Sequence, residues 1–367
     1  MPENMKRIIV SGYLGFSNFG DEAILHVLIN DLLKVGYKRE NITVISNNPE
    51  MTIAEHNIKT ISRWNLFAFI NALITHSELV FIGGLFQDKT SFRSLFYYAA
   101  QMIVAALFQR EIAFFAVGVG PLQGKMSKFL FDFATKYVHF ITVRDQVSSS
   151  LIPFDNRRNV AVTCDPVWTI KPEFGFKNRL SNVNWNLPIL GLSMRNDKLL
   201  KGRHLTNIID KLARVLTSMK EWQILLIPCM PSEDLPVLFE VQNLLIQKTA
   251  LPERVINIEH FSEFPITQQA GILASCSVVV GMRFHSLLVS VANGKPVFGL
   301  IYDQKVKSLL DYSGQVGVSY RDDFEQPWSY FWQNIQHSSD LARMAAQKAE
   351  QFHKINIDLL QALYNVS

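Results

Sequence analysis

The segment Gly281–Leu288 places an arginine and a histidine where an apolar run changes into a helix-like pattern. Residues 277–280 predict a buried strand, and residues 287–292 predict an apolar helix. Arg283 and His285 therefore fall at the carboxyl edge of a parallel sheet, where ligands bind. Arg283 offers a permanently charged fork for carboxylate or phosphate, and His285 can exchange a proton near neutral pH. Because the helix start also favours anions, these residues indicate proton transfer on a small anionic substrate.

A structural role is the main alternative for both residues. A histidine near a helix start is often a cap or a satisfied core residue, and an arginine beside it is often half of an ion pair. The remaining motifs of the chain have to decide between these two interpretations.

A second motif, Gly12–Glu22, follows the strand-like residues 8–10 and opens the first expected helix. It is neither a Walker A loop nor a GxGxxG motif, because Asp21 and Glu22 stand where Lys and Ser/Thr would be needed. Its glycines permit tight turns and a close approach of the backbone to a ligand. Asp21 is either the N-cap of the helix or a carboxylate that orients or deprotonates a substrate hydroxyl.

Two further glycine motifs, Gly83–Asp88 and Gly118–Pro121, also follow expected strands, although glycines there often only form turns. The segment Thr142–Asp145 ends another strand with an arginine. Arg144 either pairs with Asp145 or reaches as a second cation into a cleft between domains.

Two lysines follow the strand-like residues 297–300. Lys305 and Lys307 are either solvated surface lysines, the usual state of Lys, or, for Lys305, part of an anion site.

Strand-like runs alternate with helix-period segments along the chain, which predicts parallel sheets covered by helices on both faces. In the first half we expect strands at 8–10, 43–46, 79–82, 112–117 and 140–143, the last completing that half, and helices at 21–33, near residue 51 and at 94–108. In the second half we expect strands at 189–194, 223–228, 255–258, 278–280 and 297–300, and helices at 204–218, 235–249, 267–274, 287–292 and 338–363.

Residues 171–188 lack periodicity and are rich in asparagine, which indicates a linker. The fold class expected is therefore α/β, with two Rossmann-like domains with parallel sheets, GT-B-like, and a cleft between the domains. We expect an N-terminal domain at 1–175, a linker at 176–188, a C-terminal domain at 189–337, and a C-terminal helix at 338–367 that packs back.

The composition suits two well-buried globular domains: 367 residues, 48% hydrophobic and 19% charged. The net charge of +4 comes from scattered residues and gives no nucleic-acid footprint. The cysteines Cys164, Cys229 and Cys276 share no CxxC spacing, which indicates a reducing cytosol without disulfides or structural zinc. The histidines are dispersed, so no catalytic metal is expected.

Residues 1–7 are polar and do not resemble a signal peptide. The apolar residues 94–108 are interrupted by Gln101 and are too short to span a bilayer, so we expect a buried helix, with shallow membrane contact as the alternative.

Taken in order, these motifs resemble the polysaccharide pyruvyl transferase family over residues 8–310. The matching segments begin at Gly12, Gly83, Val117, Thr142 and Gly281. The resemblance implies a GT-B-like fold and transfer of the enolpyruvyl group of phosphoenolpyruvate onto a sugar, forming a 4,6-pyruvate ketal with release of phosphate. It further implies N-acetylmannosamine of a lipid-linked cell-wall polysaccharide precursor as acceptor. The chain departs from the family at Leu85, where a third glycine is expected, and at Cys164, where another small residue usually precedes Asp-Pro.

The resemblance, combined with the residue types, suggests a role for each motif residue. His285 is expected to act as general acid and Asp21 to handle the acceptor hydroxyl. The expected donor-binding residues are Arg144, Arg283, Phe284 and Lys305, mostly in the C-terminal domain. The expected acceptor loops, in the N-terminal domain, contain Gly15, Asn18, Gly20, Gly84, Gln87 and Asp88.

No cofactor is expected, since phosphoenolpyruvate is a co-substrate, and the expected location is the cytoplasm, with contact at the inner face of the cell membrane as an open alternative. Two other functions remain open: a GT-B glycosyltransferase or sugar-nucleotide epimerase, and a non-catalytic carbohydrate- or phosphate-binding protein.

Overall fold

The computed structural model describes residues 6–88, 92–153, 160–197, 200–319, 321–322 and 324–365. Most of the polar N-terminal segment, residues 1–5, therefore lies outside the described residues. The chain forms two compact units. Unit 1 contains Met1–Phe16, Asp21–Pro166 and Ala349–Ser367, and unit 2 contains Ser17–Gly20 and Val167–Lys348.

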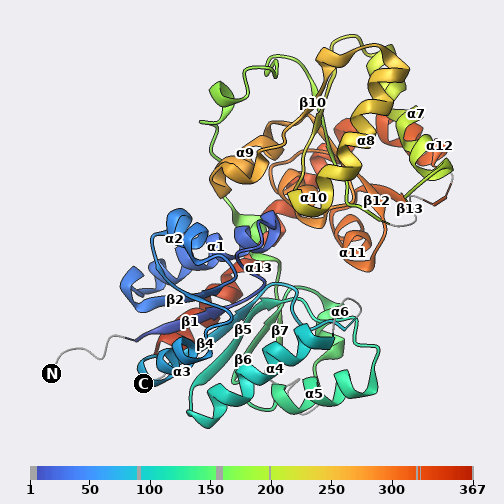
Figure 1. Cartoon of the computed structure of the whole chain (residues 1–367). Coiled ribbons are helices and arrows are strands. Elements are labelled where there is room, and N and C mark those ends of the chain that lie inside the picture. Colours follow the sequence, from blue (N-terminus) through green and yellow to red (C-terminus); the bar gives the residue numbers. More distant parts are fainter. Residues whose placement is uncertain are drawn as a thin grey trace. The chain divides into compact units, whose positions relative to one another are not determined.

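Unit 1 is built on a seven-stranded parallel sheet with the order β3-β2-β1-β4-β5-β6-β7 (Figure 1). Its strands are β1 (Ile8–Ser11), β2 (Ile42–Ser46), β3 (Lys59–Ser62), β4 (Glu78–Ile82), β5 (Glu111–Val117), β6 (Phe140–Val143) and β7 (Val160–Val162). The helices between them are α1 (Phe19–Val35), α2 (Pro49–His56), α3 (Leu66–Thr75), α4 (Phe92–Leu107), α5 (Lys125–Thr135) and α6 (Gln146–Leu151). The central strands β1, β2 and β4 are buried along their whole length, as expected for a sheet with helices on both faces.

Unit 2 contains a six-stranded parallel sheet with the order β10-β9-β8-β11-β12-β13. Its strands are β8 (Ile189–Ser193), β9 (Gln223–Leu226), β10 (Val255–Asn257), β11 (Val278–Gly281), β12 (Val297–Ile301) and β13 (Val316–Ser319). Its helices are α7 (Arg203–Ser218), α8 (Pro231–Thr249), α9 (Ile266–Ser275), α10 (Phe284–Ala292), α11 (Gln304–Ser313) and α12 (Glu325–Gln333).

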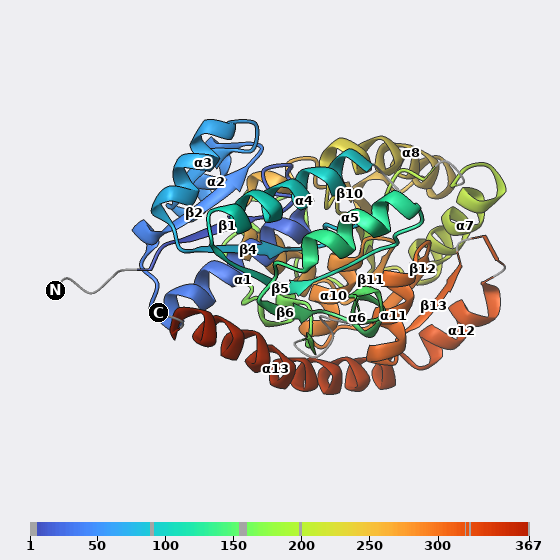
Figure 2. The same cartoon turned by 90° about the horizontal axis from the view of Figure 1, so that it is seen from below.

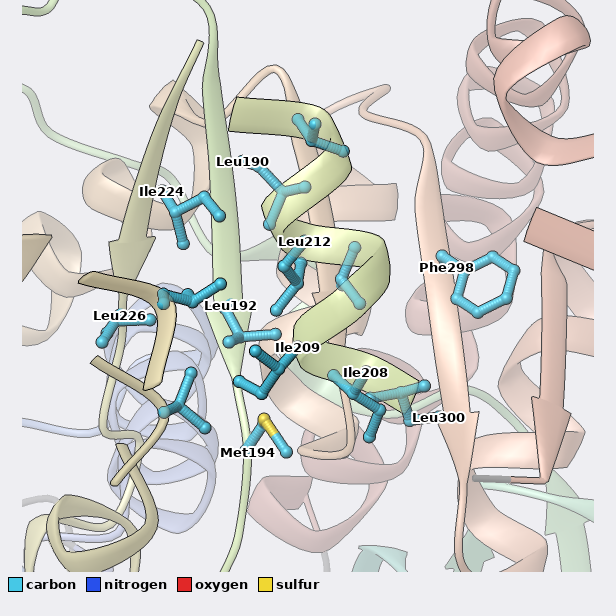
Figure 3. Close-up of a cluster of buried hydrophobic side chains, with 14 of the residues drawn as sticks. Leu190, Leu192, Met194, Ile208, Ile209, Leu212, Ile224, Leu226, Phe298 and Leu300 are labelled. Atoms are coloured by element: carbon cyan, nitrogen blue, oxygen red, sulfur yellow. The ribbon is translucent and has the colours of Figure 1, made fainter. Parts of the chain in front are cut away.

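The core of unit 2 forms where α7 covers the sheet (Figure 3). Leu190 and Leu192 of β8 and Leu226 of β9 pack against Ile209 and Leu212 of α7. Ile209 and Leu212 are three residues apart and lie on one stripe of α7, so burial of this stripe fixes the helix on the sheet.

The α/β class with parallel sheets is confirmed, and all strands expected from the sequence are present. The expectation that residues 140–143 complete the first half is wrong, because β7 adds a strand beside β6. The sequence patterns also missed β3 and β13. These three are short edge strands that are at most half-buried. β3 and β13 lack a continuous apolar run, and the apolar run of β7 is only three residues long.

The last helix, α13 (Ile335–Asn365), has residues in both units. Within unit 1 its C-terminal half lies beside α1 (Figure 2). There, His353 Nε2 is 2.7 Å from Asp31 Oδ2. Both side chains are buried. Burial alone would raise the pKa of Asp31, but the contacts with His353 and Lys34 outweigh it and lower the pKa. This pair therefore couples the end of the chain to the first helix.

Replacing His353 by alanine should destabilise unit 1 by about 3 kcal/mol, because Asp31 would lose its buried partner. The matched control is Lys354→Ala, which changes an exposed neighbour on the same helix and should cost less than about 0.5 kcal/mol. Chemical denaturation followed by circular dichroism measures both values. Equal stability of the two variants would show that the pair does not stabilise the fold.

Candidate active site

His285 lies in the first turn of α10, directly after the carboxyl end of β11. Within unit 2, its ring packs so closely on the Cα atom of Gly20 that a Cβ atom there would overlap the imidazole. The Gly20 segment is held in place by Phe19, whose backbone N–H donates to the Cys229 carbonyl at 2.9 Å. The structure thus brings together His285 and Gly20, two predicted site residues that are far apart in the sequence.

Arg283 precedes α10 and lies against two carboxylates of the first turn of α8. Its Nε donates to Asp234 Oδ1 at 3.0 Å, and its Nη2 donates to Glu233 Oε2 at 2.8 Å. Burial alone would lower the pKa of Arg283, but the charge of Asp234 outweighs it and raises the pKa. Of the guanidinium nitrogens, Nη1 makes no hydrogen bond within the described residues. It is the nitrogen through which Arg283 can bind a further anion.

The carboxylate partners of Arg283 belong to a wider charged network at the carboxyl edge of the second sheet. Arg195, after β8, lies 3.6 Å from Glu233, and its Nη1 is 3.4 Å from the hydroxyl of Tyr302, after β12. Asp234 is fully buried, and burial raises its pKa despite the opposing charge of Arg283.

No sequence motif predicted a role for Arg195, Glu233, Asp234 or Tyr302. The only signal that could have found them is that each follows the end of a strand of the same sheet, which places them along one edge.

Lys305 and Lys307 lie in the first turns of α11 and differ in their surroundings. Lys307 is exposed and pairs with Asp311 at 2.6 Å, so it forms an ordinary surface ion pair along the helix. Lys305 is half-buried near the start of the same helix, which makes it the better placed of the two for a ligand. Phe284 packs edge-on against His285, with ring centroids 4.9 Å apart.

Unit 1 presents a separate group of predicted residues at the carboxyl edge of its own sheet. Asp21 lies in the first turn of α1, which begins at Phe19, so Asp21 is not the N-cap. Its carboxylate lies over Gly83, where a Cβ atom would be 2.9 Å from Oδ1.

Arg144 is buried in the same edge of unit 1 and donates to Asp165 Oδ2 at 3.1 Å. Its guanidinium packs on Gly118, where a Cβ atom would be 2.7 Å away. Burial alone would lower the pKa of Arg144, but the charges of Asp165, Asp145 and Asp21 outweigh it and raise the pKa. The glycines after β4 and β5 therefore make room for a carboxylate and a guanidinium, respectively.

Glu22 is a buried carboxyl group for which the sequence predicted no role. Its Oε1 accepts the backbone N–H of Gly15 at 2.8 Å, and Gly15 adopts a positive φ of 77°. A Cβ atom on Gly15 would overlap Ser46 and Asn48, so only glycine fits this turn. Burial raises the pKa of Glu22 to about 7. The side chain holds the glycine loop and titrates near neutral pH.

The remaining predicted loop residues lie close to backbone turns. Asp88 accepts the N–H of Gln123 at 2.9 Å and that of Gly124 at 2.7 Å, which fixes the segment before α5. Gly84 and Gln87 lie in the half-buried loop after β4, and Asn18 lies just before α1. For Asp88 the contacts support a structural role.

A cavity of about 330 Å³ lies at the end of β10 in unit 2. The polar atoms of the Asn257 side chain are buried there and make no hydrogen bond within the described residues. Arg179 lies over the Phe264 ring at 4.1 Å and also lines the cavity. An amide that offers both a donor and an acceptor can bind a small polar group, and no sequence pattern had pointed to it.

All three cysteines are free and buried. Burial raises the pKa of Cys229 and of Cys276 to about 12, so these thiols are poor nucleophiles. Within the described ranges, no group of three or more His, Cys, Asp or Glu side chains could hold a metal ion.

The two parallel sheets, with charged side chains at their carboxyl edges, define an α/β protein with two Rossmann-like units. The sequence matches the polysaccharide pyruvyl transferase family over residues 18–304, and the chain belongs to that family. No curated protein matches the chain.

Solved structures with a similar fold confirm the GT-B-like architecture. The UDP-GlcNAc 2-epimerase of Methanocaldococcus jannaschii has a TM-score of 0.66 at 12% identity, covering 90% of this chain and 92% of that chain. Anabaena HepE in complex with UDP has a TM-score of 0.62 at 14% identity, covering 98% of this chain and 100% of that chain. At such low identities the likeness shows the fold alone.

Gly20→Ala should displace the His285 ring, because the added Cβ atom would overlap it, and should cost roughly 1–3 kcal/mol of stability. The matched control is Gly175→Ala in the same unit, where a Cβ atom would be 3.4 Å from Gln268. Imidazole NMR resonances of His285 should move in the first variant and stay in place in the second. Unmoved resonances in Gly20→Ala would disprove the contact.

Glu22→Gln should remove a pH dependence of stability. The folded carboxyl holds its proton up to a pKa of about 7 against an ordinary value of 4.5, so ionisation at higher pH destabilises the native state. Wild-type stability should fall relative to the variant between these two pH values, by up to about 3 kcal/mol. Denaturation of both proteins from pH 4 to pH 8 measures this, and parallel curves would contradict it.

Proposed function

We propose that this protein transfers the enolpyruvyl group of phosphoenolpyruvate onto a sugar and closes a 4,6-pyruvate ketal. The observation that carries the proposal is the family match over residues 18–304, which includes both Gly20 and His285, packed on each other. A proton donor beside an arginine, at a helix start that favours anions, suits a phosphorylated and carboxylated donor.

The reaction proceeds in balanced steps. His285 as general acid protonates C3 of phosphoenolpyruvate, which makes C2 electrophilic. One sugar hydroxyl adds to C2 and loses its proton, and the C2–O bond to phosphate then breaks. The second hydroxyl adds to the resulting oxocarbenium carbon and loses its proton, so that the products are the ketal and inorganic phosphate.

The cationic residues bind the donor anions in this proposal. Arg283 uses Nη1, since its Nε and Nη2 are held by Asp234 and Glu233. Two carboxylates fix the guanidinium plane in advance, which lowers the cost of ordering it when the donor binds. Lys305 supports the leaving phosphate, and Arg144 provides a second arginine for an anionic group. Phe284 limits the movement of the imidazole.

Asp21 orients or deprotonates the acceptor hydroxyl in this proposal. The glycine loops around it, which contain Gly15, Gly84 and Gln87, form the acceptor side. Since burial raises the pKa of Glu22 to about 7, this side chain changes its protonation state near neutral pH while it holds the loop, which couples acceptor binding to pH. The proposed acceptor is N-acetylmannosamine of a lipid-linked cell-wall precursor, handled in the cytoplasm.

The experiment that tests this function is acceptor-dependent release of phosphate from phosphoenolpyruvate, followed by mass spectrometry of the sugar. A mass gain of one pyruvyl ketal supports the proposal. Release of a nucleotide from a nucleotide sugar would instead support a glycosyltransferase or epimerase, as in the UDP-bound structures of similar fold. Binding without turnover would support a carbohydrate- or phosphate-binding protein.

His285→Ala should lower kcat by about 10²–10⁴-fold, because the general acid is lost, while donor affinity should change little. The matched control is His260→Ala, which removes an exposed histidine of the same unit that forms a surface pair with Glu263. Steady-state kinetics and donor titration of both variants decide the matter. Near-wild-type turnover in His285→Ala would exclude the acid role.

A further inference from the structure

Three helices of unit 1 expose large apolar side chains to solvent. Trp64, just before α3, is 74% exposed, Phe67 of α3 is 88% exposed, and Phe129 of α5 is 65% exposed. We define the aromatic face as these residues together with their exposed apolar neighbours on the same three helices, Leu66, Phe96 and Phe133. Soluble surfaces rarely gather so many large apolar groups without a partner.

The aromatic face is one surface because α3, α4 and α5 cover the same side of the first sheet (Figure 1, Figure 2). Their opposite stripes contribute Phe69, Leu95 and Phe131 to a single core cluster. The ring of Trp64 lies 6.2 Å from that of Tyr97 on α4, which connects α3 to α4. Helices α4 and α5 also contact each other along their length.

The charges on this surface are mainly positive. Arg93 on α4 and Lys125, Lys128 and Lys136 in and after α5 are exposed, whereas Asp132 is the one acidic residue within the three helices. On α5 the exposed lysines alternate with Met126, Phe129 and Phe133, so charge and apolar groups occupy the same stripe.

We propose that the aromatic face is a docking surface for an anionic lipid bilayer. Helices that lie in a membrane interface typically combine Trp, Phe and Leu with lysines on one face. Their aromatic rings enter the headgroup region, and their lysines contact lipid phosphates. A protein partner fits less well, because lysine is depleted in the cores of protein interfaces. In the described part of the chain no helix is long and apolar enough to cross a membrane.

This surface holds the protein on the bilayer by several shallow contacts. The buried inner stripes of α3, α4 and α5 keep the helices on the sheet, so the outer aromatic rings can insert without unfolding unit 1. The inference does not rest on the proposed transferase activity, because the surface and its charges are independent of the site residues.

Vesicle flotation tests the proposal with phosphatidylcholine vesicles that contain or lack phosphatidylglycerol. The intact protein should float with anionic vesicles, and raised salt should weaken the binding. Quenching by brominated lipid should report insertion of Trp64, the only tryptophan of unit 1. Trp64→Phe should keep flotation and lose this quenching.

Variants separate the two contributions to binding. Phe67→Ser with Phe129→Ser should weaken vesicle binding at least tenfold, since two large apolar groups no longer leave water. Lys125→Glu with Lys128→Glu should abolish the preference for anionic vesicles. The matched control is Phe174→Ser with Tyr330→Ser in unit 2, where the side chains are 51% and 54% exposed and the change should have no effect.

Circular dichroism and thermal denaturation establish that each variant is folded, so a negative result cannot come from unfolding. Absence of binding to anionic vesicles by the folded wild type would overturn the proposal. An equal loss of vesicle binding in the control, Phe174→Ser with Tyr330→Ser, would also overturn it. A concentration-dependent dimer that Phe67→Ser with Phe129→Ser dissociates, without vesicle binding, would assign the aromatic face to a second copy of the chain instead.

Discussion

Burial on both faces of a parallel sheet is the constraint on which the rest of this protein depends. The central strands of both units have no solvent-facing side, so polar chemistry can appear only where the strands end. In unit 2 the strand ends supply Arg195, Arg283 and Tyr302, and the first turn of α8 supplies two carboxylates. In unit 1 the strand ends supply Arg144 and two glycines, Gly118, which leaves room for Arg144, and Gly83, which leaves room for Asp21.

Within unit 2 this constraint places the Arg283 guanidinium against the carboxylates of Asp234 and Glu233 instead of in solvent. An isolated buried guanidinium would be costly, and Asp234 offsets that cost by direct contact. The two interpretations of Arg283 that the sequence left open, an ion pair and an anion ligand, are therefore compatible. Carboxylates hold one side of the fork, and the remaining nitrogen can bind a substrate anion.

Much of the fold could be predicted from the sequence, because a fully buried strand needs a continuous apolar run and residues such as Val278–Val280 provide one. The edge strands β3 and β13 could not be predicted, since exposure to solvent removes the need for such a run. The sequence predicted which residue types of the candidate site lie at strand ends. It did not predict which of these residues contact each other. Gly20 and His285, or Asp234 and Arg283, are distant along the chain, and their contacts are set by strand order, which periodicity does not encode. Glu22 was missed because burial, not sequence, makes it unusual.

The division of α13 between the two units bears on how the chain is completed during synthesis. Asp31 leaves the ribosome before the main segment of unit 2, whereas its partner His353 leaves after it. The contact between α1 and α13 can therefore form only after the second sheet has been translated, and until then part of the α1 surface is uncovered. The point at which unit 1 can complete its folding is therefore set by α13, a helix that follows unit 2 in the sequence.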